Sequence, residues 1–289
     1  MMPCTLQKNA YKASVAVEPI DSIGSIHASF LHAGTRSTHH RQSDIDNIMV
    51  AMKRRTDNRV GNRLLDALPR RQLSQFLTHC ETVTMQFGEL LARKDMPVQH
   101  AYFPLSGFAS LVIKVVGHKP LELHLIGNEG MLGAELALGS GLAPHTSMVQ
   151  GSGTVLRISA SAFIGQLESS PALRELCNRY IYVLVVQLAQ SIACNCFHDV
   201  SQRLARWLLM THDRSDGKGL ELTHAFLATM LGVRRSAVTI AAGNLQQQQL
   251  IVYSRGHIRL LSRHGLEEVA CECYAAGVEA YRRGIGPER

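Results

Sequence analysis

One long apolar segment most limits how this chain can fold. After Ser169-Ser170-Pro171, which is a helix-capping signal with proline in the first turn, the run PALRELCNRYIYVLVVQLAQSIACNCFH continues to His198 without a helix breaker. The stripe Leu173, Cys177, Tyr180, Leu184, Leu188 and Ser191 recurs at helical spacing, and Ile181, Val183, Val185 and Val186 make other faces apolar too. A helix that is apolar nearly all round must be covered on two sides. We therefore predict a dimerisation helix over residues 171–198 and a homodimer, with a helix buried inside a monomer as the alternative.

Charge and cysteine usage restrict the partners and the compartment. The chain has 289 residues, a net charge of +7 and a pI near 9.2, which favours a polyanionic partner. Its seven cysteines form no disulfide-like framework, and the first residues lack an apolar signal-peptide core. The most apolar run, from Ile181 to Ala189, is about half the roughly 18 residues that a membrane span needs. We expect a cytoplasmic protein with no transmembrane segment and no membrane partner.

The segment before the long helix divides into two parts. Residues 1–58 lack sustained periodicity, and we expect a disordered or poorly ordered extension there. Within residues 59–170, short β-rich runs such as HAYFPL, LELHLI and TVLRIS alternate with turns that contain glycine or proline. This spacing predicts an antiparallel β-roll of the jelly-roll type, which can enclose a ligand pocket and act as a sensor domain. The predicted fold class is α+β.

Residues 199–289 have the pattern of a domain that approaches phosphates. From Thr223 to Gly265 the sequence contains five arginines and no lysine, aspartate or glutamate. Thr223 is placed to cap a helix with Leu227 and Leu231 inside, and Gly232 permits the left-handed turn that ends this helix. A solvated basic face is the alternative interpretation of the charge.

A second helix and a hairpin complete this pattern. From about Arg234 the residues Val238, Ala241, Ala242 and Leu245 recur at helical spacing and form an inward face. The opposite face carries Arg235, Ser236, Thr239, Ile240 and Gly243, so an arginine pair stands at the amino end of a helix that can enter a major groove. LIVYSRGHIRLL adds a hairpin with a basic tip at Arg255. Together these elements predict a C-terminal winged helix-turn-helix.

Residues from about Asn62 to Tyr274 resemble the Crp/Fnr family of bacterial transcription regulators. The resemblance rests on FHDVSQRLARWLL (Phe197 to Leu209), on LTHAFLATMLGVRRSAVTIAAGNLQQQQLI and on IGNEGMLGAELALG (Ile126 to Gly139), which is similar to the effector-roll motif. It implies a β-roll sensor, a dimerisation helix and a winged helix on a near-palindromic site in double-stranded DNA, with RNA polymerase as a further candidate partner. The candidate DNA-binding residues are Thr223, Arg234, Arg235, Ser236, Thr239, Ile240, Arg255 and His257.

The recognition helix departs from the resemblance at two positions. Arg235 matches the family's base-reading arginine, whereas Ser236 stands where a glutamate is common and Ile240 where an arginine is common. Arg235 can pair with guanine N7 and O6, and Ile240 offers only an apolar contact such as one to a thymine methyl. The half-site should therefore differ from the best-known site of the family.

The expected effector pocket also departs from the resemblance. Cyclic-nucleotide sensors of the family use a glutamate after glycine for the ribose and an Arg-Ser pair for the cyclic phosphate. Here Gly133 and Glu135 are separated by Ala134, and His145-Thr146 take the place of the Arg-Ser pair. A neutral imidazole cannot replace a bidentate guanidinium on phosphate, so we disfavour cyclic AMP and leave the small-molecule effector unidentified.

The cysteines and histidines leave two further hypotheses. Cys194-x-Cys196-x-His198 and Cys271-x-Cys273 suggest a thiol-responsive or metal-binding regulator, but both pairs fall on expected helices, where residues two apart diverge by about 200°. Buried structural thiols, with no cofactor and no metal, are the favoured interpretation. A remote hypothesis is a cupin-like metal enzyme that would use His118, His124 and Glu129, but the spacing of these residues does not fit that fold. We expect no enzymatic activity, because no nucleophile–base set or phosphate loop is found elsewhere.

Overall fold

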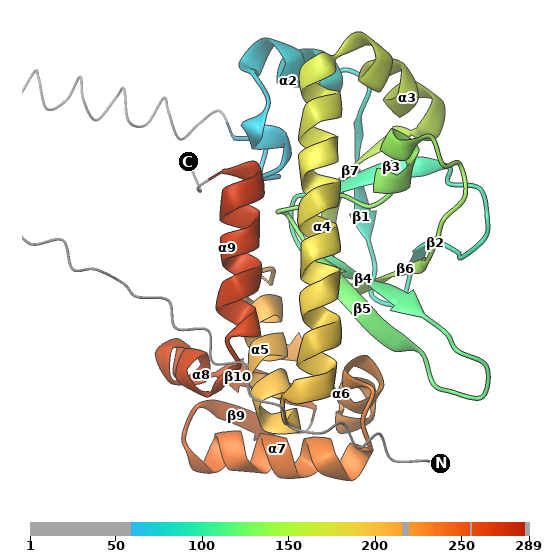
Figure 1. The fold of residues 1–289 in the computed structure, drawn as a ribbon. Coiled ribbons are helices and arrows are strands. Elements are labelled where there is room, and N and C mark those ends of the chain that lie inside the picture. The colour runs from blue at the N-terminus through green and yellow to red at the C-terminus, as the bar shows by residue number, and fades with distance from the viewer. Residues whose placement is uncertain (1–58, 216–219, 255, 287–289) are drawn as a thin grey trace, which may run out of the picture. The chain divides into compact units, whose positions relative to one another are not determined.

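The structure is a computed structural model that describes residues 59–286 apart from 216–219 and 255, so the extension expected at residues 1–58 lies outside it. Figure 1 shows how the elements follow one another. The elements before the long helix are η1 (Leu65–Ala67), α2 (Arg70–Leu77), β1 (Glu81–Met85), β2 (Leu90–Ala92), β3 (His100–Pro104), β4 (Phe108–Ile113), β5 (Leu121–Ile126), η2 (Ala134–Leu138), β6 (Thr146–Gly151), β7 (Gly153–Ser159) and α3 (Ala160–Ser169). The remaining elements are α4 (Pro171–Phe197), α5 (Val200–His212), β8 (Leu220–Glu221), α6 (His224–Leu231), α7 (Arg235–Gln247), β9 (Ile251–Ser254), β10 (His257–Leu260), α8 (Arg263–Val269) and α9 (Cys273–Ile285).

The β-rich segment forms two antiparallel sheets, in the orders β1-β7-β3 and β2-β6-β4-β5. Phe76 of α2, Phe103 of β3 and Phe163 of α3 meet edge to face in the core, with ring centroids 5.4–6.4 Å apart. Such aromatic contacts fix how the two helices cover the sheet. The antiparallel roll expected from the alternating pattern is confirmed. The short strand β2 and the helix α3 had no counterpart in the sequence analysis.

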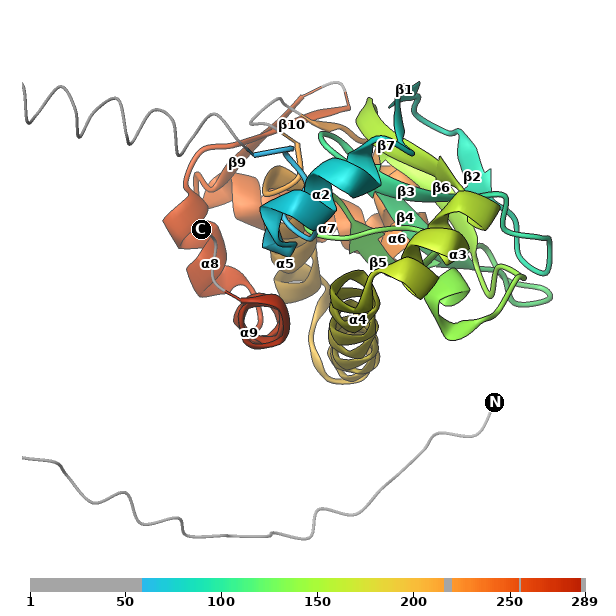
Figure 2. The ribbon, with the colours of Figure 1, turned by 90° about the horizontal axis from the view of Figure 1, so that it is seen from above.

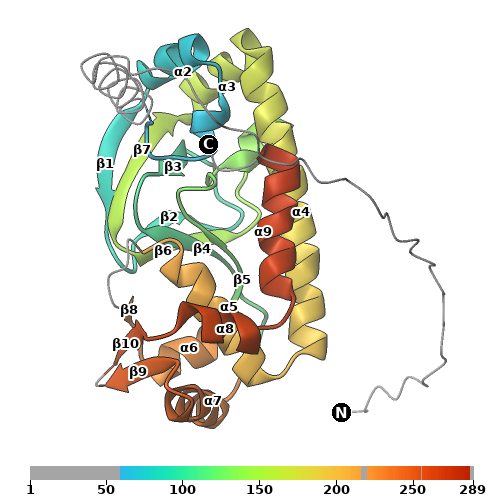
Figure 3. The ribbon, with the colours of Figure 1, turned by 90° about the vertical axis from the view of Figure 1, so that its left-hand side faces the viewer.

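The long helix α4 begins where the capping signal predicts. The Ser170 hydroxyl accepts a hydrogen bond from the backbone N–H of Leu173, and Pro171 occupies the first turn. Leu173, Tyr180 and Val183 are buried against the rest of the chain. Figures 1 and 3 show α9 running beside α4, and Figure 2 shows the two helices nearly end-on. In α9, a side chain added at Gly284 would collide with Val183, so the two backbones approach closely there.

By length and composition alone, α4 could cross a membrane, and so could the bent pair α6–α7 taken together. A long core helix passes the same test. Leu173, Leu176 and Cys177 of α4 belong to the same buried cluster as Phe76 and Phe103 of the roll. One apolar helix that packs in this way does not indicate a membrane protein.

A second buried cluster underlies the C-terminal part and extends to Phe108 of β4 and Leu125 of β5 in the roll. Asp199 caps α5 through the backbone N–H of Gln202, whose side chain in turn reaches the backbone of Asp199. Buried residues of α5, α6 and α7 pack together with Ile251 of β9 and Ile258 of β10. The three short strands pair antiparallel in the order β8-β10-β9. Three helices and a β-hairpin around one core form a winged helix-turn-helix, as the sequence predicts.

Candidate nucleic-acid interface and sensor cavity

The turn between α6 and α7 sets the direction of the exposed helix. Thr223 Oγ1 accepts a 3.1 Å hydrogen bond from the backbone N–H of Phe226, which caps α6 as predicted. Gly232 ends α6 in the left-handed region, with φ of 64°. The axes of α6 and α7 then differ by 107°, within the range of a helix-turn-helix.

Helix α7 has one buried and one exposed face. Its buried residues are Val238, Ala241, Ala242 and Leu245, the four that the sequence pattern predicts. The exposed residues include four of the expected DNA contacts, namely Arg235, Ser236, Thr239 and Ile240. Arg234 is exposed at the amino cap, in a β-type conformation. The structure thus brings these five side chains to one end and one face of α7.

Sequence reasoning missed a neighbour of this face. His224 Nδ1 lies 2.9 Å from Thr239 Oγ1, and its ring stacks on Tyr253 at a centroid distance of 4.4 Å. Burial and the nearby Arg235 guanidinium lower the pKa of His224, which therefore stays neutral at pH 7. No periodicity in the sequence points to this contact, because it joins the first residue of α6 to a residue of α7, on the other side of the turn.

At least one of the five arginines counted from the sequence is paired within the protein. His257 of β10 is exposed, as is Arg259, whereas Arg255 lies outside the described residues. Arg263 is not available to a phosphate in this conformation, because it pairs with Asp213 at 2.6 Å and with Glu267 at 2.9 Å. The local charge of +5 counted from the sequence is therefore an overestimate of what this surface offers.

Polar contacts join the roll to α5, the first helix of the C-terminal part. Glu122 of β5 accepts hydrogen bonds from Trp207 Nε1 at 2.8 Å and from Ser110 Oγ at 2.6 Å. Burial raises the pKa of Glu122 to about 7, although both hydrogen bonds and the charges of Arg206 and Arg214 act in the opposite direction. A second link is the ion pair of Arg214 with Glu129, at 2.6 Å and with both side chains largely buried.

A cavity of about 180 Å³ lies between the roll and α4. It brings together three of the four expected effector residues, Gly133, Glu135 and His145. Thr146 does not line it, and the Thr146 hydroxyl instead accepts a hydrogen bond from the backbone N–H of Lys94. The α4 side of the cavity is formed by Ile181, Leu184 and Leu188.

The polar groups of this cavity are few. His145 Nδ1 is buried and has no hydrogen-bond partner, and burial lowers the pKa of this imidazole. Burial also raises the pKa of Glu135. No arginine or lysine lines the cavity among the described residues. A buried ring nitrogen without a partner is a position where a ligand can form a hydrogen bond.

A larger cavity of about 380 Å³ was not expected from the sequence. It lies among α4, α5, α9 and the end of β5, and its lining includes four arginines and two carboxylates. The charged lining residues are Arg63, Glu129, Arg206, Asp213, Arg214 and Arg263. His124 Nδ1 faces this region, is buried without a partner, and has a pKa lowered to about 3 by burial and by Arg214 and Arg206. Its lining residues come from six separate segments of the chain, so no local motif predicts it.

The two sets of candidate metal ligands named from the sequence differ in whether the structure brings their donor atoms together. Cys194, His198, Cys271 and Cys273 are the one set of three or more His, Cys, Asp or Glu side chains that gathers its donor atoms in the described part of the chain. The cupin-like set of His118, His124 and Glu129 is not such a group. The expectation that both C-x-C pairs lie on helices is wrong for Cys271, which precedes the start of α9.

Comparisons with known proteins agree with this geometry. Residues 202–269 match the family model of the Crp-like helix-turn-helix domain. Among solved structures, the chain is similar to a c-di-GMP-responsive global regulator, CLP, of Xanthomonas campestris, with 17% identity over 67% of this chain and 100% of that one and a TM-score of 0.55.

Two further structures show the same fold. FixK2 of Bradyrhizobium japonicum is 14% identical over 66% of this chain and 98% of that one, with a TM-score of 0.56. A Crp/Fnr family transcriptional regulator of Thermus thermophilus is 23% identical over 66% and 98% of the two chains, with a TM-score of 0.54. A search of curated proteins by sequence found no match. Residues 202–269 are therefore a Crp-like helix-turn-helix domain, and the chain has the fold of Crp/Fnr family regulators.

Proposed function

We propose that this protein is a sequence-specific, DNA-binding regulator of transcription that reads the major groove with α7. The observation that carries the proposal is the exposed face of α7, where Arg235, Ser236, Thr239 and Ile240 stand opposite the buried face. An arginine at the amino end of a groove-entering helix can pair with guanine. Contacts to the DNA phosphate backbone are proposed for Thr223, Arg234, Arg255 and His257. RNA polymerase is a candidate partner on the promoter.

We further propose that the protein acts as a cytoplasmic homodimer, as regulators of this family do. Six residues of α4 are exposed at alternating steps of four and three, which is the spacing of a coiled-coil seam. They are Asn178, Tyr182, Val185, Ala189, Ile192 and Cys196. The side chains of Tyr182 and Ile192 are 67% exposed, an extent that favours a second copy over solvent. A two-fold dimer implies a near-palindromic DNA site.

The cavity of about 180 Å³ is the proposed effector site. Its apolar lining, the unpartnered His145 Nδ1 and the absence of lining arginine or lysine among the described residues favour a small, weakly polar effector over a cyclic nucleotide. Because Leu184 and Leu188 of α4 line the same cavity, an occupant would touch the helix that we expect to form the dimer. Gly133, Glu135 and His145 are the residues proposed to contact it.

A thiol-responsive regulator of the same fold is the second candidate, and one observation favours it. Cys194 Sγ and Cys271 Sγ lie 3.5 Å apart. One molecule of hydrogen peroxide would convert the two thiols into a disulfide and release two molecules of water. A reversible change of DNA affinity on peroxide and then dithiothreitol would support this candidate, and an unchanged affinity would remove it.

A salt titration tests the proposed function. We would measure the affinity of the full chain for a mixed-sequence duplex by fluorescence anisotropy, for the wild type and for Arg234→Gln. The salt slope should be steep, and the variant should reduce it by roughly one unit. Arg70→Gln removes the same charge from exposed α2 and should leave the slope unchanged. A shallow slope in the wild type, or equal effects of both variants, would contradict DNA binding through α7.

A further inference from the structure

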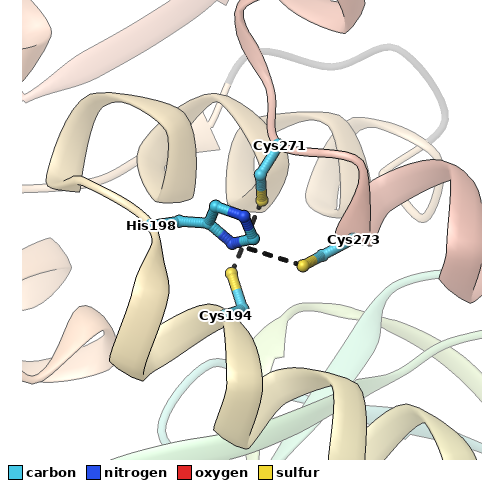
Figure 4. Close-up of side chains that lie close together, drawn as sticks. All are labelled: Cys194, His198, Cys271 and Cys273. Atoms are coloured by element: carbon cyan, nitrogen blue, oxygen red, sulfur yellow. Dashed lines mark hydrogen bonds between the residues drawn. The ribbon is translucent and has the colours of Figure 1, made fainter. Parts of the chain in front are cut away.

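Four metal-ligating side chains meet where α4 ends and α9 begins (Figure 4). Cys194 and His198 are four residues apart at the end of α4 and therefore share one face of it. Cys271 precedes α9, and Cys273 is its first residue. Their donor atoms all lie within 4.8 Å of one another. The cluster joins segments more than 70 residues apart in the sequence.

The distances fit one tetrahedral ion. Cys194 Sγ lies 3.5 Å from Cys271 Sγ, and Cys273 Sγ lies 3.4 Å from His198 Nδ1. Zinc bonds of about 2.3 Å to sulfur and about 2.0–2.1 Å to nitrogen place tetrahedral ligand atoms about 3.6–3.8 Å apart. Small side-chain rotations would therefore admit the ion. A multi-iron cluster needs more widely separated thiolates than this compact group provides.

The surroundings hold the ligands in orientation. His198 turns Nδ1 toward the sulfurs, and its Nε2 lies 3.2 Å from the Glu272 carboxylate, an arrangement in which the carboxylate fixes the ring and its tautomer. Gln190 Nε2 donates a 3.0 Å hydrogen bond to Cys273 Sγ. Such outer contacts are typical of metal sites and have no obvious purpose around three inert thiols.

Burial separates this cluster from the remaining cysteine nearby. Cys194, Cys271 and Cys273 are 1–3% exposed, whereas Cys196 is exposed and is not part of the group. The thiolate is the form in which a cysteine binds metal.

We propose that Cys194, His198, Cys271 and Cys273 bind one divalent metal ion of the zinc class. Three thiolates and one neutral imidazole form a closed tetrahedral site, with no open position for substrate, so the ion has a structural role. It fastens the start of α9 to the end of α4, directly before Asp199 caps the first helix of the DNA-binding part. Binding releases the protons of the cysteine thiols.

Metal content tests the proposal. The full chain would be purified without oxygen and with reductant, exposed to Zn²⁺, passed through a desalting column and analysed by mass spectrometry of the metal. We expect one zinc per chain in the wild type and in Cys196→Ser, and less than a tenth of that in Cys194→Ser and Cys273→Ser. Less than a tenth of an equivalent in the wild type, or equal losses in Cys196→Ser, would overturn the proposal.

Cobalt and a milder variant keep the test independent of folding. With Co²⁺ the wild type should show thiolate-to-cobalt charge transfer and intense visible bands of a tetrahedral site. Glu272→Gln changes an exposed side chain and should weaken zinc affinity about 10–100-fold in competition with a chromophoric chelator. An octahedral cobalt spectrum, or a Cys194–Cys271 disulfide in the freshly reduced wild type, would overturn the proposal.

Discussion

The indole Nε1 of Trp207 donates a 2.8 Å hydrogen bond to Oε1 of Glu122 and so ties α5 to strand β5 of the roll. Glu122 is also held by Ser110, on the neighbouring strand β4. This carboxyl group therefore belongs to the roll but has its partner in the part of the chain that matches the helix-turn-helix family. We propose that an effector bound in the roll would act on the helix-turn-helix through this contact.

The protonation of Glu122 should make stability depend on pH. Burial raises its pKa from 4.5 to about 7, so the folded state holds the proton more tightly than the unfolded state. Stability from this group is therefore lost as the pH rises from about 4.5 to about 7, by up to about 3 kcal/mol. The variant Glu122→Gln keeps the shape of the side chain, and its amide cannot ionise. Chemical denaturation from pH 5 to pH 8 should show the variant gaining stability over the wild type as the pH rises.

The comparison of the two proteins isolates Glu122 from its neighbours. The buried His124, with a pKa lowered to about 3, destabilises the fold as the pH falls below about 6.5 in both proteins, so it does not change the difference between them. A constant difference between wild type and variant across the range would contradict the buried, proton-holding Glu122.

Arg235 should determine one base of the DNA site. It is exposed at the start of α7, and Arg235→Ala should cost about 1–3 kcal/mol of binding to the preferred site and relax the preference at one position of each half-site. Arg234→Ala, one residue earlier at the helix cap, should weaken all sequences alike. Binding to a set of single-base site variants measures both effects. Unchanged selectivity of Arg235→Ala would show that another register or another element reads the bases.

The exposed seam of α4 should control assembly. Ile192→Arg places a charge in the proposed dimer interface, and sedimentation velocity should show a monomer where the wild type is a dimer. Ile164→Arg is the control, because Ile164 is a 40% exposed isoleucine on α3, away from the seam. If the wild type is monomeric at micromolar concentration, or if Ile192→Arg still dimerises, α4 is not the interface.

Gly232 should be required for the turn between α6 and α7. An alanine there would lose about 1–2 kcal/mol to the left-handed conformation, and its Cβ would lie 2.7 Å from Leu121 Cδ1. Gly243→Ala is the matched control, since no atom lies within 4 Å of the added methyl and α7 gains about 1 kcal/mol in helix propensity. The midpoint of urea unfolding should fall for Gly232→Ala and rise for Gly243→Ala. If Gly232→Ala left the free energy of unfolding unchanged, the turn would tolerate another conformation.

Local signals in the sequence predicted much of this molecule. Ser170 and Pro171 mark the start of α4, and Thr223 and Gly232 mark the two ends of α6. The inward face of α7 is identified by the helical spacing of Val238, Ala241, Ala242 and Leu245. Each of these signals acts through the backbone or through one helix. They are therefore readable without knowledge of the tertiary structure.

The features that sequence reasoning missed depend on contacts between distant segments. The metal-ligating cluster needs α9 to lie beside α4. A helix was expected at Cys271 and Cys273, but no sequence pattern predicted where it packs. Judged one pair at a time, each C-x-C is a poor chelate, whereas the structure combines Cys194 with His198 and with the other pair. The stacking of His224 on Tyr253 and the cavity of about 380 Å³ are likewise products of tertiary packing.

Selection of bound duplexes from a random pool by the purified protein tests the central claim most directly. The account predicts enrichment of a two-fold-symmetric sequence, with half-sites about one helical turn apart and a guanine whose enrichment disappears for Arg235→Ala. Affinity for the enriched duplex should fall steeply with salt. Enrichment of an asymmetric single site, or of no sequence under any salt condition, would contradict a dimer that reads DNA through α7.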